Sequence, residues 1–189
     1  MTFDAAFTRF PTLTTKRLRL RQIELNDAKD LFATFSDKEV MRFYGQEPHR
    51  SLNETRQWIE YAQTNYRLRE TMRWGITLKD EDKVIGSCSF HYFDREHRRA
   101  ETGYELNRAF WRQGLMTEAM AAALTYGFTK LDLHRVEAII NIANEPSKGL
   151  LLKLGFIYEG NLRQRRVFRG RFEDEHYFGL LQDEWLGLV

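Results

Sequence analysis

The junction at Gly114 constrains the fold more than any other feature of this sequence. Residues 99–107 alternate as a strand does, and the residues after Gly114 have the spacing of a helix. The apolar positions on one face of that helix are Leu115, Ala119, Ala122, Ala123 and Tyr126. Glycine lets the backbone adopt unusual angles and approach a ligand closely. Because the free N–H groups at a helix N-terminus carry partial positive charge, the junction predicts an anion site, typically one for phosphate.

The pattern around this junction predicts a sheet with helices packed on its faces. Further strands are expected at residues 17–21, 72–78, 84–93, 135–141, 156–168 and 172–181. Further helices are expected at residues 28–35, from Ser36, from Ser51 to Tyr66, and from Pro146 to Leu154. The order β-α-α-α-β-β-β-α-β-α-β-β indicates an α+β fold with a mixed sheet. A length of 189 residues indicates one domain, residues 1–189.

The composition and motifs exclude several classes of protein. No apolar run approaches the roughly 20 residues that a membrane span needs. Cys88, the single cysteine, is expected to be a buried structural thiol, and it excludes an internal disulfide and a multi-cysteine zinc site. A reduced, cytoplasmic setting follows, and no metal is expected. The junction lacks both the Gly-Lys-Ser/Thr ending of a nucleotide-triphosphate loop and the three glycines of a dinucleotide loop, which disfavours an ATPase or a dehydrogenase.

Several motifs follow one another in a fixed order along the chain. The first runs through Ala100–Leu106 and Phe110–Ala119, and the second through Asn144–Ser147 and Leu151–Phe156. Together they resemble the GNAT superfamily of N-acetyltransferases. The closing segments resemble the subgroup of ribosomal-protein N-terminal acetyltransferases: Glu159-Gly160, Leu162-Arg163, Asp174–Tyr177, Leu180-Leu181 and Glu184-Trp185. The resemblance covers about residues 13–185, the expected core of the domain.

The resemblance implies a mostly antiparallel sheet of about seven strands, whose fourth strand (99–107) splays from the fifth (135–141). Acetyl-coenzyme A (acetyl-CoA) would be the cosubstrate, with its pantetheine arm in that gap. A backbone N–H near Leu106 and Asn107 would face the thioester oxygen. The pyrophosphate would lie on the loop, mainly on its backbone: Arg112, Gln113, Gly114, Leu115, Met116 and Thr117. Asn144 and Ser147 would contact the coenzyme arm. The loop departs from the usual pattern at Trp111 and Met116.

Two carboxylates are candidates for the proton transfer that the reaction needs, since an amine attacks only as the free base. Glu101 and Glu105 lie four apart in a strand, so both point to one face. Either could accept the proton directly or through water, and either could instead be paired with a nearby arginine. At the helix position where many similar proteins carry a tyrosine acid, this chain has Leu151. Ser147, Tyr158 or water could then protonate the leaving thiolate.

The favoured acceptor is a protein N-terminal α-amine, with a small amine or an antibiotic as the alternative. Acetyl-CoA and this amine are the expected partners; no membrane is involved, nucleic acid is not required, and a homodimer is left open. Five arginines fall within nine residues, between Arg163 and Arg171. Such crowding is typical of a solvated edge or of a surface for an acidic partner. A different class of function, a non-catalytic RNA- or ribosome-binding module, would use this arginine hairpin.

Overall fold

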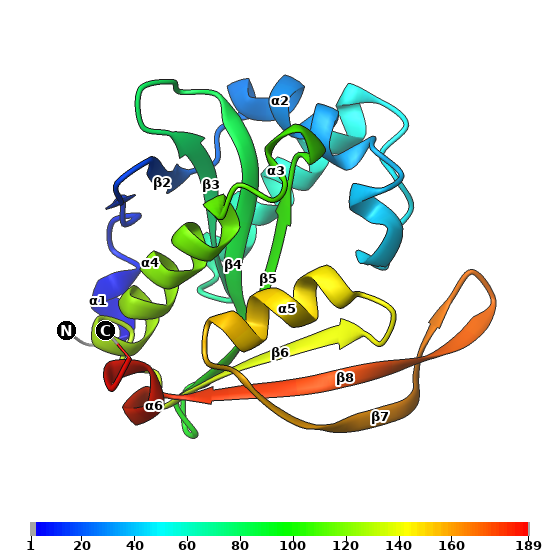
Figure 1. Cartoon of the computed structure of the whole chain (residues 1–189). Coiled ribbons are helices and arrows are strands. Elements are labelled where there is room, and N and C mark those ends of the chain that lie inside the picture. The colour runs from blue at the N-terminus through cyan, green and yellow to red at the C-terminus, as the bar shows by residue number, and fades with distance from the viewer. Residues whose placement is uncertain (1–2, 189) are drawn as a thin grey trace.

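A computed structural model describes residues 3–188, in which the strands form one eight-stranded sheet of order β1-β2-β3-β4-β5-β6-β8-β7 (Figure 1). All neighbouring strands are antiparallel except β5 and β6, which are parallel. The strands are β1 (Leu13–Thr14), β2 (Leu18–Gln22), β3 (Thr71–Leu78), β4 (Val84–Asp94), β5 (Arg99–Leu106), β6 (Arg135–Asn141), β7 (Ile157–Phe168) and β8 (Arg171–Leu181). The expected mostly antiparallel α+β fold is confirmed, and the eighth strand is the two-residue β1.

Helices cover both faces of this sheet. The α-helices are α1 (Phe3–Ala6), α2 (Ala28–Phe35), α3 (Leu52–Arg67), α4 (Leu115–Thr129), α5 (Glu145–Lys153) and α6 (Gln182–Leu186). Short 3-10 helices are η1 (Leu25–Asp27), η2 (Val40–Phe43) and η3 (Arg108–Phe110). In Figure 1, α4 and α5 lie in front of the sheet and α3 lies behind it. A large apolar core lies under α4 and α5, and a smaller core lies under α2 and α3. None of the helices within residues 3–188 is long and apolar enough to cross a membrane.

The prediction of a helix beginning at Ser36 was wrong. Ser36 is the C-cap residue of α2, and its N–H donates to the carbonyl of Phe32. The acidic residue after it, Asp37, accepts a hydrogen bond from the N–H of Glu39 at 2.8 Å. Aspartate stabilises turns through such local bonds, so the capping pattern here makes a turn. Only η2 follows, at Val40–Phe43.

The gap between β5 and β6 is the feature that creates the site. These strands pair at three positions, Arg99 with Arg135, Ala100 with Val136 and Glu101 with Glu137. Beyond Glu101 the strands separate, as the predicted splay requires, and Figure 1 shows α5 lying across this region. The edge of β5 from Thr102 to Leu106 is therefore not paired with β6.

Candidate functional site

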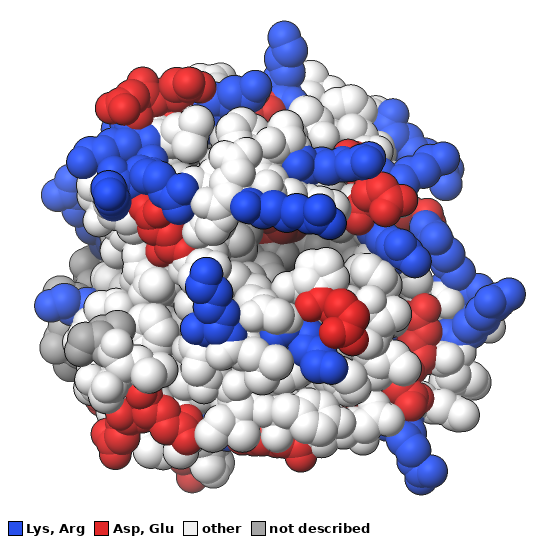
Figure 2. Space-filling view, viewed as in Figure 1, with Lys and Arg blue, Asp and Glu red and all other residues white. Residues whose placement is uncertain are grey.

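A cavity of about 1800 Å³ opens where β5 and β6 separate. Its walls come from β5, β6, the starts of α4 and α5, the segment around η2 and part of α3. Figure 2 shows this face hollowed at its centre, with Lys and Arg side chains along the edges of the hollow. The lining includes five glutamates, seven arginines and one lysine, so the cavity as a whole carries an excess of positive charge.

The loop before α4 has the geometry of an anion site. Gly114 is the N-cap of α4 with φ +72°, and Arg112 also has a positive φ, +60°. Among the described residues, the backbone N–H groups of Leu115, Met116 and Thr117 have no acceptor, as expected in a first helical turn. These donors point to the cavity edge together with the positive end of the helix. The side chain of Leu115 is buried in the core, so this residue offers only its backbone.

A partly exposed network that the sequence did not reveal holds this loop. Arg17 donates from Nε to Glu118 of α4 at 2.7 Å and from Nη1 to the carbonyl of Gln113 at 2.9 Å. Thr15 donates its hydroxyl to the same carboxylate at 2.6 Å. Burial would raise the pKa of Glu118, but the hydrogen bonds from Thr15 and Arg17 outweigh it and lower that pKa. The network ties the loop to the β1–β2 corner.

Alternate backbone groups of β5 face the gap. The N–H of Asn107 donates to the carbonyl of Ile85 on β4 at 2.8 Å. Because N–H groups in an antiparallel strand alternate in direction, those of Tyr104 and Leu106 point away from β4, toward the missing partner. The Asn107 side chain accepts from the N–H of Ala109 and caps η3. Trp111 Nε1 donates to the carbonyl of Leu106 at 2.7 Å, which packs the loop against the end of β5.

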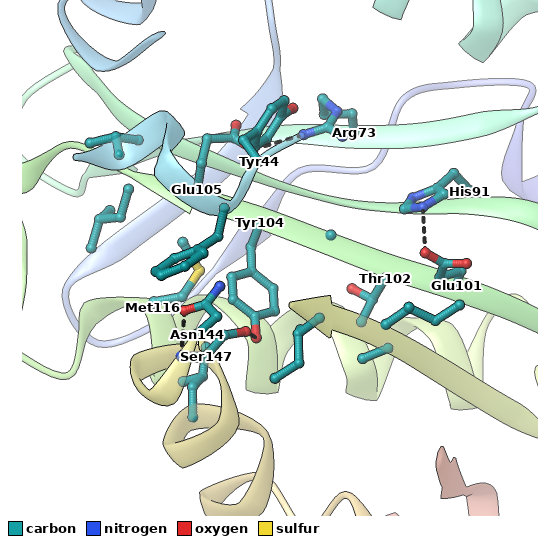
Figure 3. Close-up of a pocket in the computed structure, with 18 of the residues that line it drawn as sticks. Tyr44, Arg73, His91, Glu101, Thr102, Tyr104, Glu105, Met116, Asn144 and Ser147 are labelled. Carbon is teal, nitrogen blue, oxygen red and sulfur yellow. Dashed lines mark hydrogen bonds and ion pairs between the residues drawn. The ribbon is translucent and has the colours of Figure 1, made fainter. Parts of the chain in front are cut away.

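The start of α5 forms the opposite side of the gap. Asn144 is the N-cap, and its side chain accepts from the N–H of Ser147 at 3.2 Å. The hydroxyls of Ser147 and Tyr104 lie 2.5 Å apart (Figure 3). Leu151, one turn further along, is fully buried in the core and brings no polar group to the cavity.

Glu101 faces the cavity from β5 and lies beside an imidazole. His91 on β4 is its direct cross-strand partner, with Nε2 3.5 Å from Oε1 of Glu101 (Figure 3). Both side chains are about one-fifth exposed, 21% each. The Glu101 carboxylate therefore remains accessible to a bound molecule, whereas three other glutamates of the cavity lie beside arginines.

Glu105, on the same face of β5, is enclosed by partners. Arg73 Nη1 lies 3.2 Å from Oε2, and the Ser87 hydroxyl donates to Oε1. Tyr44, the residue that follows η2, packs beside this group (Figure 3). Burial raises the pKa of Glu105, against the opposing effect of Arg73 and Ser87, and burial also raises the pKa of Tyr44. The pairing with Arg73 favours a structural role for Glu105 over a role as the base that accepts the proton.

Cys88 is fully buried, as expected, and burial raises its thiol pKa to about 12. A thiol so protected and so weakly acidic does not act as a nucleophile at neutral pH. Within residues 3–188, no three His, Cys, Asp or Glu side chains gather in a way that could hold a metal ion.

The arginine hairpin is engaged rather than free. Arg165 and Arg166 lie 2.6 and 3.8 Å from the carboxylate of Glu175. Arg169 pairs with Glu47 at 2.9 Å, and Arg166 also donates to the carbonyl of Gly45 at 2.7 Å. Three of the five arginines thus bind groups of this chain, and two of them, Arg165 and Arg166, line the cavity.

The sequence predicted the loop and the β5 carboxylates as site residues but did not indicate the side chains that surround them. Tyr44, Arg73, His91 and Tyr104 all line the cavity. Alternation along β5 could have placed Tyr104 on the face opposite Glu101 and Glu105. Nothing local in the sequence connects Tyr44 or Arg73 to this site, because η2 and β3 reach it only through the tertiary fold.

Comparisons with known proteins agree with this geometry. The profile described as acetyltransferase (GNAT) domain matches residues 17–157. The uncharacterised N-acetyltransferase YoaA of Bacillus subtilis is 40% identical over 92% of this chain and 98% of its own length. Spermidine N(1)-acetyltransferase of Escherichia coli is 24% identical over 89% of this chain and 88% of its own.

One solved structure extends the comparison to three dimensions. A Vibrio cholerae protein, titled a "putative ribosomal-protein-serine acetyltransferase", superposes with a TM-score of 0.76 at 26% identity, over 96% of this chain and 99% of its own. Its fold therefore matches nearly the whole of the present sheet and helices. The profile match and the relationship to YoaA show that this chain belongs to the GNAT family of acetyltransferases.

Proposed function

We propose that this acyltransferase moves the acetyl group of acetyl-CoA to the N-terminal α-amine of a protein. The coenzyme pyrophosphate would bind the free N–H groups at the start of α4, beside Arg112. The pantetheine arm would run along the unpaired edge of β5, between Leu106 and the start of α5. The residues fit this ligand, because the loop has positive φ at Gly114 and Arg112, and a Cβ added at Gly114 would meet only Arg17 Nη2, at 3.7 Å.

The backbone N–H groups of Tyr104 and Leu106 would face the thioester. A donor aimed at the oxygen that becomes negative in the tetrahedral intermediate contributes about 3–4 kcal/mol to transition-state stabilisation. Glu101, backed by His91, would take the proton of the attacking amine, directly or through water. The N–C bond forms, the C–S bond breaks, and the acetyl group passes directly to the amine.

The protonation state of the acceptor favours an α-amine. With an ordinary pKa near 7.8, an α-amine is roughly one-quarter neutral at pH 7.4, whereas a lysine near 10.4 is only about 0.1% neutral. A partly exposed carboxylate with a neighbouring imidazole, such as Glu101 with His91, is a modest base. It suits an amine that is already partly deprotonated in water.

The observation that carries the proposal is the charge of the cavity lining. Three of the five lining glutamates lie beside arginines: Glu105 with Arg73, Glu175 with Arg165 and Arg166, and Glu39 with Arg42. A polyamine carries several positive charges and needs a surplus of carboxylates, but the arginines outnumber the glutamates here. A polypeptide terminus presents one amine on an otherwise neutral backbone, and the similarity to the Vibrio cholerae structure supports the same acceptor class.

An acceptor panel tests the proposal. Purified protein and acetyl-CoA would be incubated with peptides of differing first residue, the same peptides with a blocked N-terminus, spermidine and an aminoglycoside. We expect transfer to free N-termini, loss of transfer on blocking, and little product with spermidine. Transfer to spermidine or to the aminoglycoside alone would refute the acceptor assignment. Saturable binding of acetyl-CoA by isothermal titration is expected in every case, and its absence would refute the coenzyme site.

The same titration separates an enzyme from an RNA-binding module. Because Arg165, Arg166 and Arg169 are already paired within the chain, we expect weak binding to RNA that does not compete with acetyl-CoA. Tight RNA binding that weakens steeply with salt would favour the module instead.

A further inference from the structure

Strand β5 presents different chemistry on its two faces. Glu101 and Glu105 share the face that meets His91 and Arg73, whereas Tyr104, directly before Glu105, points to the other face. On that side the Tyr104 ring reaches the start of α5, where its hydroxyl meets that of Ser147 at 2.5 Å (Figure 3). The gap that would hold the thioester therefore has carboxylates on one side and a phenol on the other.

Few other proton donors line the α5 side of the gap. The Thr102 hydroxyl is already used, since it donates to the carbonyl of Ser89 at 2.9 Å. Leu151 has no polar group, and Lys153 lies in the last turn of α5, away from its start. Tyr44 lies with Glu105 on the opposite face. Among the described lining residues on the α5 side of the gap, the hydroxyl pair of Tyr104 and Ser147 is what remains beside the unpaired edge of β5.

We infer that Tyr104 is the group that protonates the coenzyme sulfur as it leaves, with Ser147 holding the phenol in position. The inference rests on the proposed function, because it assumes a thioester in the gap between β5 and β6. As the N–C bond forms and the C–S bond breaks, the amine proton goes to Glu101 and the electron pair of the C–S bond goes to sulfur. The sulfur takes the proton of the Tyr104 hydroxyl, which regains one from water through Ser147.

The electrostatics of the gap are compatible with this role. Burial raises the pKa of Tyr104, so its hydroxyl stays protonated at neutral pH. The same loss of solvent disfavours a thiolate, whose ordinary pKa is about 8.5, and makes the departing sulfur more basic than in water. Burial thus raises the pKa of the proton donor, Tyr104, and that of the coenzyme thiol in the same direction. The proposed base, Glu101, and the proposed acid, Tyr104, would lie on opposite sides of the C–S bond that breaks.

The substitution Tyr104→Phe tests the inference, because it removes one oxygen and keeps the ring. We expect kcat to fall by about 100-fold, the lower end for general acid catalysis since a thiolate already leaves well. The dissociation constant of acetyl-CoA, measured by titration, is expected to change by less than about threefold. Tyr66→Phe is the matched control, because that hydroxyl has no hydrogen-bond partner among the described residues and lies outside the cavity.

Ser147 provides the second test. Ser147→Ala should lower kcat by about fivefold, the worth of one hydrogen bond, and Ser147→Thr should restore it. A kcat of Tyr104→Phe within about threefold of the wild type overturns the inference. So does a larger loss for Ser147→Ala than for Tyr104→Phe, which would make Ser147 the donor. If Tyr104→Phe does not fold, an unchanged kcat for Ser147→Ala overturns it. A wild-type protein that acetylates no amine refutes the proposed function instead.

Discussion

Arg166 donates a hydrogen bond from its guanidinium to the backbone carbonyl of Gly45, over a distance of 2.7 Å and 121 positions of sequence. The bond joins the β7–β8 hairpin to the segment that follows η2, and Arg169 adds an ion pair to Glu47 in that segment. Tyr44 and Arg166 both line the cavity. In Figure 1 the hairpin extends away from the sheet on the right, below the segment drawn in blue and cyan. The contact therefore bounds one end of the cavity, which we propose is the end that receives the acceptor.

Gly45→Ala is predicted to open this contact. Gly45 has φ +81°, which strains any other residue, and an added Cβ would overlap the Arg166 guanidinium. Because the Arg166 side chain is flexible, we expect the guanidinium to move away from Gly45 and the protein to stay folded. The free energy of unfolding should fall by about 1–2 kcal/mol. The KM for the acceptor should rise, and the dissociation constant of acetyl-CoA should stay unchanged. Steady-state kinetics with varied acceptor measure this.

Gly160→Ala is the control for that experiment, since an added Cβ there meets nothing within 4 Å and Gly160 lies on β7, outside the cavity. It should behave as the wild type. An acceptor KM for Gly45→Ala equal to that of the control would show that the hairpin contact does not shape the acceptor site.

Glu101→Gln is predicted to lower turnover and to shift its pH dependence upward. Without the carboxylate, the attacking amine must lose its proton to water, so the rate should rise with pH as more amine becomes neutral. General base catalysis typically contributes at least about 100-fold, and this is the expected loss near pH 7. The measurement is kcat/KM from pH 6 to pH 10. Glu96→Gln, in the exposed turn after β4, serves as the control, and an unaltered pH profile in Glu101→Gln would remove Glu101 as the base.

The sequence alone could place the loop at Gly114 and the two carboxylates, because each depends on local periodicity. The strand pattern put Glu101 and Glu105 on one face, and the helix pattern put free N–H groups after Gly114. The sequence could not show which of the two carboxylates is accessible and which is paired with arginine, because that difference comes from neighbours on other strands. Glu105 meets Arg73, which lies 32 positions away, whereas Glu101 meets His91. The separation depends on the order of strands in the sheet.

The arginine hairpin shows the same limit. Crowded arginines in a sequence indicate an acidic partner without saying whether the partner is another molecule. In the structure, the partners of Arg165, Arg166 and Arg169 are Glu175, Gly45 and Glu47 of the same chain. Two of these acceptors lie more than 100 positions earlier, so no local pattern could have indicated them.

Glu105→Gln is predicted to act on stability. The Arg73 guanidinium would lose the carboxylate beside it in a buried site, where removing one partner of an ion pair typically costs about 3–5 kcal/mol. Urea unfolding should show a lower midpoint with an unchanged slope. Asp80→Asn, in the exposed turn between β3 and β4, is the control and should unfold as the wild type does. If Glu105→Gln kept full stability but lost turnover with the pH shift expected for Glu101→Gln, Glu105 would be the base.

Glu118→Gln is predicted to change how stability depends on pH on the acid side. The folded-state pKa of Glu118 is lowered below the ordinary value of 4.5 by its bonds to Thr15 and Arg17, so its contribution is present above that value and is lost as pH falls through the folded pKa. The free energy of unfolding of the wild type should therefore exceed that of the variant by about 1 kcal/mol at neutral pH, and this difference should shrink below about pH 4.5. Urea midpoints between pH 3 and pH 7 measure it, with Glu96→Gln as the control. Because Arg17 also holds the carbonyl of Gln113, the variant should bind acetyl-CoA more weakly, and a difference in stability that stays constant down to pH 3 would contradict the assignment.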